Sequence, residues 1–175
     1  MQQLATPDEL LAQLAEKIQT LLIEKAIDNP LMVGIHTGGV WVATRLHQQL
    51  NASRTTFPEP LATLDISFYR DDFSRIGMNP KVKQSKLPPD VEDRHIILVD
   101  DVLHTGRTIR AAMNELFDYG RPASITLVCL IERSGRELPL QADIVGHHII
   151  LNKGEHIKLA GPEPLTFEIQ KVSNG

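Results

Sequence analysis

The chain has 175 residues, of which 42% are hydrophobic and 23% charged, and its net charge is −4. This length is typical of a single globular domain, and the acidic balance excludes binding to nucleic acid through overall positive charge. The single cysteine, Cys129, excludes a disulfide within the chain. The apolar run 125–131 is shorter than the roughly 20 residues that span a bilayer. Residues 1–6 lack the basic and apolar regions of a signal peptide. We therefore expect a cytoplasmic protein with no membrane contact.

Helical and extended patterns alternate along the chain. The first helix is predicted to begin at Thr6-Pro7-Asp8-Glu9, because Thr6 and Glu9 have the spacing of a capping box. Pro30 ends its apolar stripe. Later strands are predicted at Leu31–His36, Leu61–Phe68, His95–Asp100 and Ser124–Ile131, and helices at Gly39–Leu50 and Arg107–Tyr119. From Ala142 onward, short apolar runs alternate with turn residues. The alternation predicts an α/β fold, one domain over 1–175, with a central, mainly parallel sheet flanked by helices.

The segment from about 70 to 90 differs from the rest. It is polar, contains three prolines and has no clear period. Long loops of this kind are uncommon in compact domains and are often lids over a site. By itself the pattern fits a flexible lid, a disordered insertion or an inserted hairpin.

The stretch from Ile96 to Thr108 carries the most chemical information. Four apolar residues lead into Asp100 and Asp101, and then come a short turn with Gly106 and a predicted helix. Ligands of open α/β sheets bind outside the carboxyl ends of the strands, and a helix N-terminus attracts phosphate. The two carboxylates can accept hydrogen bonds from a sugar diol. An Asp-Asp pair alone also fits an acidic turn before a helix cap. The whole string favours a ribose 5-phosphate site, and it matches neither a P-loop nor a dinucleotide fingerprint.

This string resembles the binding motif for phosphoribosyl pyrophosphate (PRPP) in type I phosphoribosyltransferases. Its form, DDVLHTGRT, resembles the PyrR family in particular, whose members include uracil phosphoribosyltransferases that regulate the pyrimidine operon. The segments 34–41, 65–72 and 132–143 are similar to that family in the same order and spacing. The resemblance covers nearly the whole chain. It implies the type I phosphoribosyltransferase fold, with a small hood at about 132–148 plus the N-terminal region and a flexible lid loop at about 70–90.

The resemblance also implies roles for individual residues. Asp100, Asp101 and Arg70 are the expected catalytic residues. The PRPP 5′-phosphate is expected at Val102, Leu103, His104, Thr105, Gly106, Arg107 and Thr108, and pyrophosphate at Thr37, Gly38 and Gly39. The base is expected at Arg136, Asp143 and Val145 in the hood. Mg²⁺ is the expected cofactor, held mainly through PRPP, with no protein metal site. Most members of the family carry arginine at the position of Gly38, so the chain departs from the family pattern there.

The activity that the resemblance implies is transfer to uracil, in which uracil and PRPP give UMP and pyrophosphate. One alternative is a UMP-responsive RNA-binding attenuator of the pyrimidine operon with secondary enzyme activity. The family's basic RNA-binding positions correspond here to Ala12, Gln13, Glu16, Gly135, Arg136, Gln141 and His147. Only Arg136 is a permanent cation, so we expect weak RNA binding. Another alternative, a purine-type phosphoribosyltransferase, is disfavoured because 132–148 contains no Phe, Tyr or Trp. We also expect a homo-oligomer, a dimer or a tetramer.

Overall fold

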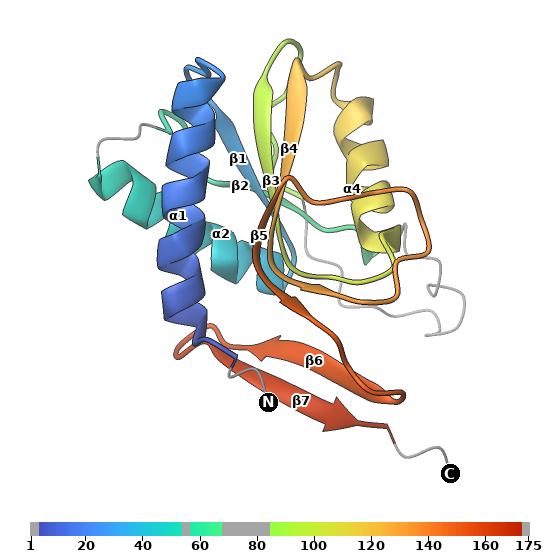
Figure 1. The fold of residues 1–175 in the computed structure, drawn as a ribbon. Helices are drawn as coiled ribbons and strands as arrows, with labels where there is room; N and C mark the ends of the chain where they lie inside the picture. Colours follow the sequence, from blue (N-terminus) through green and yellow to red (C-terminus); the bar gives the residue numbers. More distant parts are fainter. Residues whose placement is uncertain (1–3, 54–56, 68–84, 173–175) are drawn as a thin grey trace.

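The computed structural model describes residues 4–53, 57–67 and 85–172. Three helices and seven strands are present in these ranges (Figure 1). The helices are α1 (Pro7–Glu24), α2 (Gly38–Ala52) and α4 (Arg107–Asp118). The strands are β1 (Leu31–Ile35), β2 (Ala62–Leu64), β3 (His95–Leu103), β4 (Ser124–Arg133), β5 (Ile144–Ile149), β6 (Glu155–Ala160) and β7 (Thr166–Lys171). The alternation predicted from sequence is therefore confirmed.

Five strands form one parallel sheet in the order β2-β1-β3-β4-β5. Helices α1 and α2 cover one face of this sheet and α4 covers the other (Figure 1). From β1 the chain adds β2 on one side and β3 on the other, so the strand order reverses between β1 and β3. In open α/β sheets the crevice beyond such a reversal is where ligands bind. The fold thus places the candidate site at the carboxyl ends of β1 and β3.

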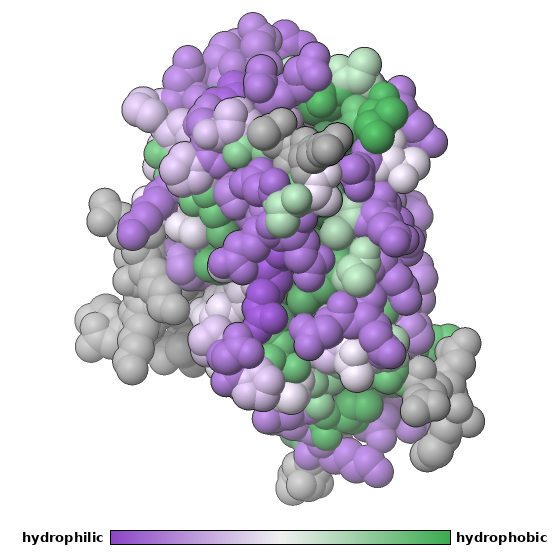
Figure 2. Space-filling view, turned by 90° about the vertical axis from the view of Figure 1, so that its left-hand side faces the viewer, coloured by the Kyte–Doolittle hydropathy of each residue, from purple (hydrophilic) through white to green (hydrophobic). Residues whose placement is uncertain are grey.

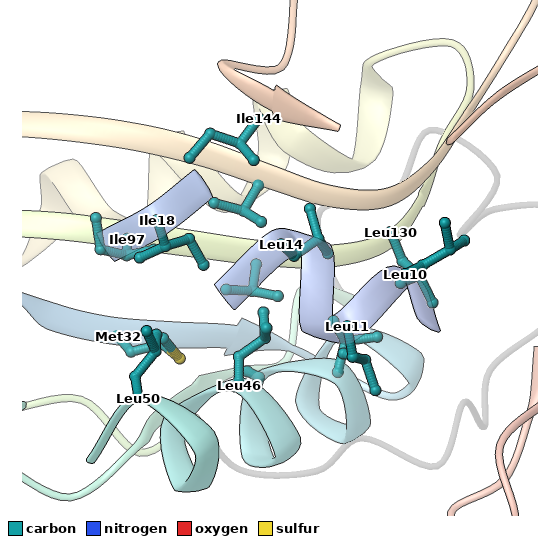
Figure 3. Packing of buried hydrophobic residues seen from close by; sticks show 14 of the residues in the cluster. Leu10, Leu11, Leu14, Ile18, Met32, Leu46, Leu50, Ile97, Leu130 and Ile144 are labelled. Atoms are coloured by element: carbon teal, nitrogen blue, oxygen red, sulfur yellow. The ribbon is translucent and has the colours of Figure 1, made fainter. Parts of the chain in front are cut away.

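Two apolar cores, one on each face of the sheet, hold the helices in place. The capping box predicted for α1 is present: the Thr6 hydroxyl accepts from the Glu9 amide at 3.3 Å, and the Glu9 carboxylate accepts from the Thr6 amide at 2.8 Å. The apolar stripe of α1 then packs against α2 and the sheet (Figure 3). Leu14 and Ile18 are fully buried there. Burying a side chain of this kind stabilises the fold by roughly 1.5–3 kcal/mol.

β2 and β3 differ most from their predicted bounds. β2 is only three residues long, because Asp65 turns the chain and its carboxylate accepts from the Ser67 amide at 3.0 Å. β3 is longer than expected and continues through Asp100 and Asp101 to Leu103, since its last residues still pair with β4. Both acids therefore lie within the strand, which was predicted to end at Asp100.

The last hairpin, β6–β7, lies beyond the carboxyl end of the sheet and next to the start of α1 (Figure 1). Leu159 and Leu165 anchor it in the core beneath α1 and α2. Arg45 of α2 joins the same region through ion pairs to Glu163 at 2.5 Å and Asp8 at 3.7 Å. Within the described residues, no helix is both long and apolar enough to cross a membrane.

Candidate active site

The two consecutive acids at the end of β3 are held by their own backbone. Asp100 is buried, with 5% of its surface exposed, and its carboxylate accepts from the Asp101 amide at 2.9 Å. The Asp101 carboxylate accepts from the Val102 amide at the same distance. A carboxylate oxygen can accept more than one hydrogen bond, so both acids can also accept from ligand hydroxyls. Cys129, opposite Asp100 on β4, is buried, and burial raises the pKa of its thiol well above the usual value, so it is no nucleophile.

The loop that is expected to bind the 5′-phosphate, residues 102–108 and here called the phosphate loop, follows the acids and leads into α4. Gly106 is the N-cap of α4 and has a positive φ of 92°, which favours glycine. It has no side chain to cap the helix, and the Thr105 hydroxyl accepts from the Arg107 amide at 3.2 Å. The first turn of α4 thus offers backbone N–H groups and the positive end of a helix dipole. This is the geometry of a phosphate site.

A second glycine-containing segment, Thr37 to Gly39, forms the N-cap and first residues of α2 just after β1, and it lies against the acids. No side chain caps α2, and the His36–Thr37 peptide bond is cis. A methyl group on Gly38 would collide with the Asp101 carboxylate, and one on Gly39 would lie 2.7 Å from the Val99 carbonyl oxygen. Gly39 therefore needs glycine while the β3 backbone keeps its present shape, whereas Gly38 needs it only while the Asp101 side chain keeps its present position. The family's usual arginine at position 38 would require the Asp101 side chain to turn away.

The hood, residues 132–148, is bonded directly to the phosphate loop. The Thr105 carbonyl accepts from the backbone amides of Glu137 and Leu138, both at 3.0 Å. The Glu137 carboxylate also accepts from the Arg107 guanidinium at 3.0 Å. These contacts add to the pairing of Leu103 on β3 with Glu132 on β4, which also joins the phosphate loop to the hood.

A pocket of about 360 Å³ lies between the hood and the end of β5. The phosphate loop contributes His104 to its wall. Ile149 and Ile150 form an apolar side, and Ile150 is 89% exposed. The remaining lining residues are Glu132, Arg133, Ser134, Gly135, Arg136, Gln141 and His148. We call this the base pocket, because the base is expected to bind at the hood.

The comparisons with known proteins agree with this geometry. Residues 4–162 match the family model described as phosphoribosyl transferase domain. A protein from Nitrosococcus oceani named "Bifunctional protein PyrR" is 58% identical over 165 residues, which cover 94% of this chain and 92% of that protein. A protein of the same name from Pseudomonas aeruginosa is 52% identical over 98% of both chains.

The chain belongs to the PyrR family of phosphoribosyltransferases.

Solved structures show the same fold in more distant members of the superfamily. The hypoxanthine phosphoribosyltransferase of Trypanosoma cruzi has a TM-score of 0.65 at 22% identity, over 84% of this chain and 79% of that one. A purine phosphoribosyltransferase from Pyrococcus horikoshii has a TM-score of 0.61 at 24% identity, over 83% and 85%. Both likenesses support the type I fold predicted from the DDVLHTGRT string.

The structure of this PyrR-family chain separates the residues that were predicted to bind the base. Arg136 lines the base pocket, and its guanidinium donates to the Leu140 carbonyl at 3.4 Å. Asp143 instead fixes the strand edge, because its carboxylate accepts from the Leu127 amide at 2.8 Å. The Val145 carbonyl accepts from the Lys17 ammonium group at 2.8 Å. Asp143 and Val145 line a different cavity.

That cavity, here called the α1 groove, lies between α1 and β5 and has a volume of about 640 Å³. It brings Glu16 and Gln141, two positions of the expected RNA face, into one surface. Hydrophilic side chains dominate the face of the molecule on the side of α1 and α2 (Figure 2). The acids lining the groove are Glu16, Glu24, Glu132 and Asp143, and Lys17 is its one lysine or arginine among the described residues.

The predicted lid and its arginine are only partly covered by the described residues. Arg70, the expected catalytic arginine, and most of the predicted lid lie outside the described residues. The end of that segment is anchored, because Lys86 exchanges two backbone hydrogen bonds with Thr63 of β2, at 2.8 and 2.9 Å.

Sequence reasoning missed Ile149 and Ile150 as pocket residues. Their signal was the end of an apolar run at the carboxyl edge of the sheet.

Proposed function

We propose that this chain transfers the phosphoribosyl group of PRPP to uracil, giving UMP and pyrophosphate. The observation that carries the proposal is the meeting of two anion-binding loops with two carboxylates at the carboxyl ends of neighbouring strands. PRPP has a matching arrangement, with a phosphate, a diol and a pyrophosphate on one sugar. The phosphate loop takes the 5′-phosphate, Asp100 and Asp101 take the ribose hydroxyls, and Thr37 to Gly39 take the pyrophosphate.

The reaction needs positioning and charge stabilisation more than a nucleophile. Departure of pyrophosphate leaves positive charge on the ribose ring, as in glycoside hydrolysis. Asp100 and Asp101 lie beside the ribose position and stabilise that charge, while the backbone amides of both loops hold the two anionic ends. Because Asp100 is buried, its charge acts through a medium of low dielectric constant, where electrostatic interactions are stronger than in water.

Mg²⁺ fits this arrangement as a cofactor that arrives with the substrate. Among the described residues, no cluster of three or more His, Cys, Asp or Glu side chains could hold a metal ion. The available oxygens on PRPP suit Mg²⁺, which keeps several waters and binds phosphate oxygens. When bound, the ion supplies positive charge that neutralises the leaving pyrophosphate.

The base pocket supports a pyrimidine as acceptor. Arg133 and Arg136 provide donors that suit the two carbonyl oxygens of uracil, and Ile149 and Ile150 provide an apolar surface for the ring face. The described lining contains no Phe, Tyr or Trp on which a purine would stack. The purine alternative therefore has less support than uracil.

RNA binding is the second candidate function, and we propose that it is weak. The name of the relatives, "Bifunctional protein PyrR", supports a second function besides catalysis. RNA affinity depends mainly on cations that neutralise phosphates. The α1 groove instead presents Glu16, Glu24 and Glu132 to an approaching ligand. Lys17 is the cation of the groove, and its ammonium group already donates to Val145.

We further propose a cytoplasmic homo-oligomer, a dimer or a tetramer. Phe117, Ile169 and Val172 are apolar side chains that are more than half exposed, which is compatible with contacts between copies. The direct test of the enzymatic proposal is UMP formation from uracil, PRPP and Mg²⁺. Product that needs all three components supports the proposal, and absence of product under all conditions would refute it.

A further inference from the structure

His104 has a different position from the rest of the phosphate loop. Its neighbours Thr105 and Gly106 serve the loop and the start of α4, whereas the His104 side chain lines the base pocket. Its ring lies over Gly135 of the hood: a Cβ atom on Gly135 would be 2.8 Å from His104 Nε2. Gly135 also has a positive φ of 109°, so the backbone conformation and the close approach of the imidazole both favour glycine at this position.

No hydrogen bond from another described residue occupies the ring nitrogens of His104. The imidazole is partly buried, and it lies where the phosphate loop meets the base pocket. In the proposed binding mode, Asp100 and Asp101 hold the ribose, the phosphate loop holds its 5′-phosphate, and its anomeric carbon is directed toward the base pocket. A ring nitrogen is therefore available to a base that enters the pocket.

Uracil must lose a proton when it becomes UMP. Its N1 carries hydrogen in the free base and carbon in the nucleotide, so a proton acceptor near the pocket helps the reaction. We propose that His104 accepts this proton and is a catalytic residue of the uracil transfer. This inference deepens the proposed function and rests on it.

The proton transfer accompanies the exchange of two bonds at C1′. The N1–C1′ bond forms while the C1′–oxygen bond to pyrophosphate breaks, and that electron pair leaves on pyrophosphate. The N1 proton passes to the imidazole, which becomes imidazolium and later releases the proton to water. The reverse reaction uses the same group as an acid.

Partial burial and a neighbouring arginine favour the neutral form of the imidazole, which is the form that accepts a proton. Partial burial lowers the pKa of His104 below its usual value of 6.5, and the positive charge of Arg133 on β4 lowers it further. Glu137 of the hood opposes this shift, and His156 on β6 adds to it. The other charged or titratable groups of the pocket are Glu132, Arg136 and His148. His148 is paired with Glu132 at 2.6 Å.

The first test compares His104→Gln with the wild-type protein. Loss of a general base typically costs about 100-fold or more in rate, so kcat should fall by at least that factor. The KM for PRPP should change little, because the backbone of the phosphate loop is untouched. The matched control is His95→Gln, at the opposite end of β3, where the histidine pairs with Ser124 at 2.7 Å. The control should keep wild-type kcat.

Two further measurements separate proton transfer from a structural role. 5-Fluorouracil has a more acidic N–H, so the loss in His104→Gln should be smaller with this base than with uracil. In the wild-type protein, kcat/KM for uracil should fall as the pH drops through a pKa below 6.5, and His104→Gln should lack this acid limb. The second measurement on the wild type remains decisive if the variant fails to fold.

The outcomes distinguish this inference from the function on which it rests. A wild-type protein that forms no UMP contradicts the proposed function itself. An active wild-type protein with an equally active His104→Gln variant, or a variant changed only in its KM for PRPP, overturns the role of His104 alone. The same holds if the variant's loss is identical with uracil and 5-fluorouracil.

Discussion

Gly38 packs directly against the Asp101 carboxylate, which occupies the space that a side chain at position 38 would need. A side chain on Gly38 would overlap the Asp101 carboxylate, and its first carbon would lie 3.0 Å from the Asp101 Cβ. The loop expected to bind pyrophosphate and the acid expected to bind ribose are therefore in direct contact. A change in one should alter the other, although the two residues are 63 positions apart in the sequence.

Gly38→Ala should lower kcat/KM for PRPP by about 10-fold, because Asp101 must turn and lose its bond to the Val102 amide. In an Asp101→Ala background the same substitution should cost much less, since the collision is gone. A double-mutant cycle with steady-state kinetics measures this coupling. Strictly additive effects would show that the two residues act independently.

Asp100→Asn and Asp101→Asn should each reduce turnover by roughly 10- to 100-fold, the usual cost of a lost charge-assisted contact. The melting temperature of Asp101→Asn should stay near the wild-type value, because its side-chain oxygen can still accept from the Val102 amide. Asp118→Asn, at the exposed end of α4, is the control and should keep full turnover. Wild-type kinetics in both site variants would remove these acids from the mechanism.

The burial of Glu115 predicts that the free energy of unfolding depends on pH. Its carboxyl is buried between α4 and Ser85, whose hydroxyl donates to one oxygen at 2.7 Å, while the other oxygen has no partner among the described residues. Burial raises the pKa above the usual 4.5, the Ser85 bond partly opposes this, and the charges of Asp65 and Asp118 add to it. Folding therefore favours the protonated form, and this stabilisation is lost as the pH rises through the raised pKa.

The free energy of unfolding of the wild type, relative to Glu115→Gln, should accordingly be most favourable below pH 4.5 and should decrease toward neutral pH. Urea denaturation at a series of pH values measures this difference. A difference that stays constant from pH 4 to 8, or that rises with pH, would contradict the assignment.

RNA binding should respond to the charge of the α1 groove. The wild-type protein should bind the pyrimidine-operon leader of its own organism weakly, with little help from UMP. Glu16→Lys should tighten binding and steepen the dependence of log K on log salt by about one unit. Glu168→Lys, exposed on β7, adds the same charge outside the groove and should have a smaller effect. Nanomolar binding by the wild type near physiological salt, tightened by UMP, would overturn this prediction.

Local sequence signals predicted the framework of this fold. The capping box and apolar stripe located α1, and the apolar run before Asp100 located β3. The extension of β3 to Leu103 was not predictable in this way, because it depends on pairing with Glu132 and its neighbours on β4. Aspartate is also uncommon in strands, and the predicted strand ended at Asp100, the first of the two acids.

The site was less predictable because it depends on contacts between distant segments. His104 belongs to the phosphate-loop string, yet Gly135 determines where its side chain lies. Asp143 and Val145 lie in the expected hood, but packing against α1 places them on another surface. Spacing along the chain holds no information about such contacts.

Base selectivity tests the central claim most directly. The measurement is kcat/KM for PRPP-dependent nucleotide formation with uracil, hypoxanthine, guanine and xanthine under identical conditions. The account predicts strong preference for uracil, because the base pocket combines arginine donors with an isoleucine surface and its described lining has no aromatic side chain. Equal or greater kcat/KM with any of the purines would contradict it.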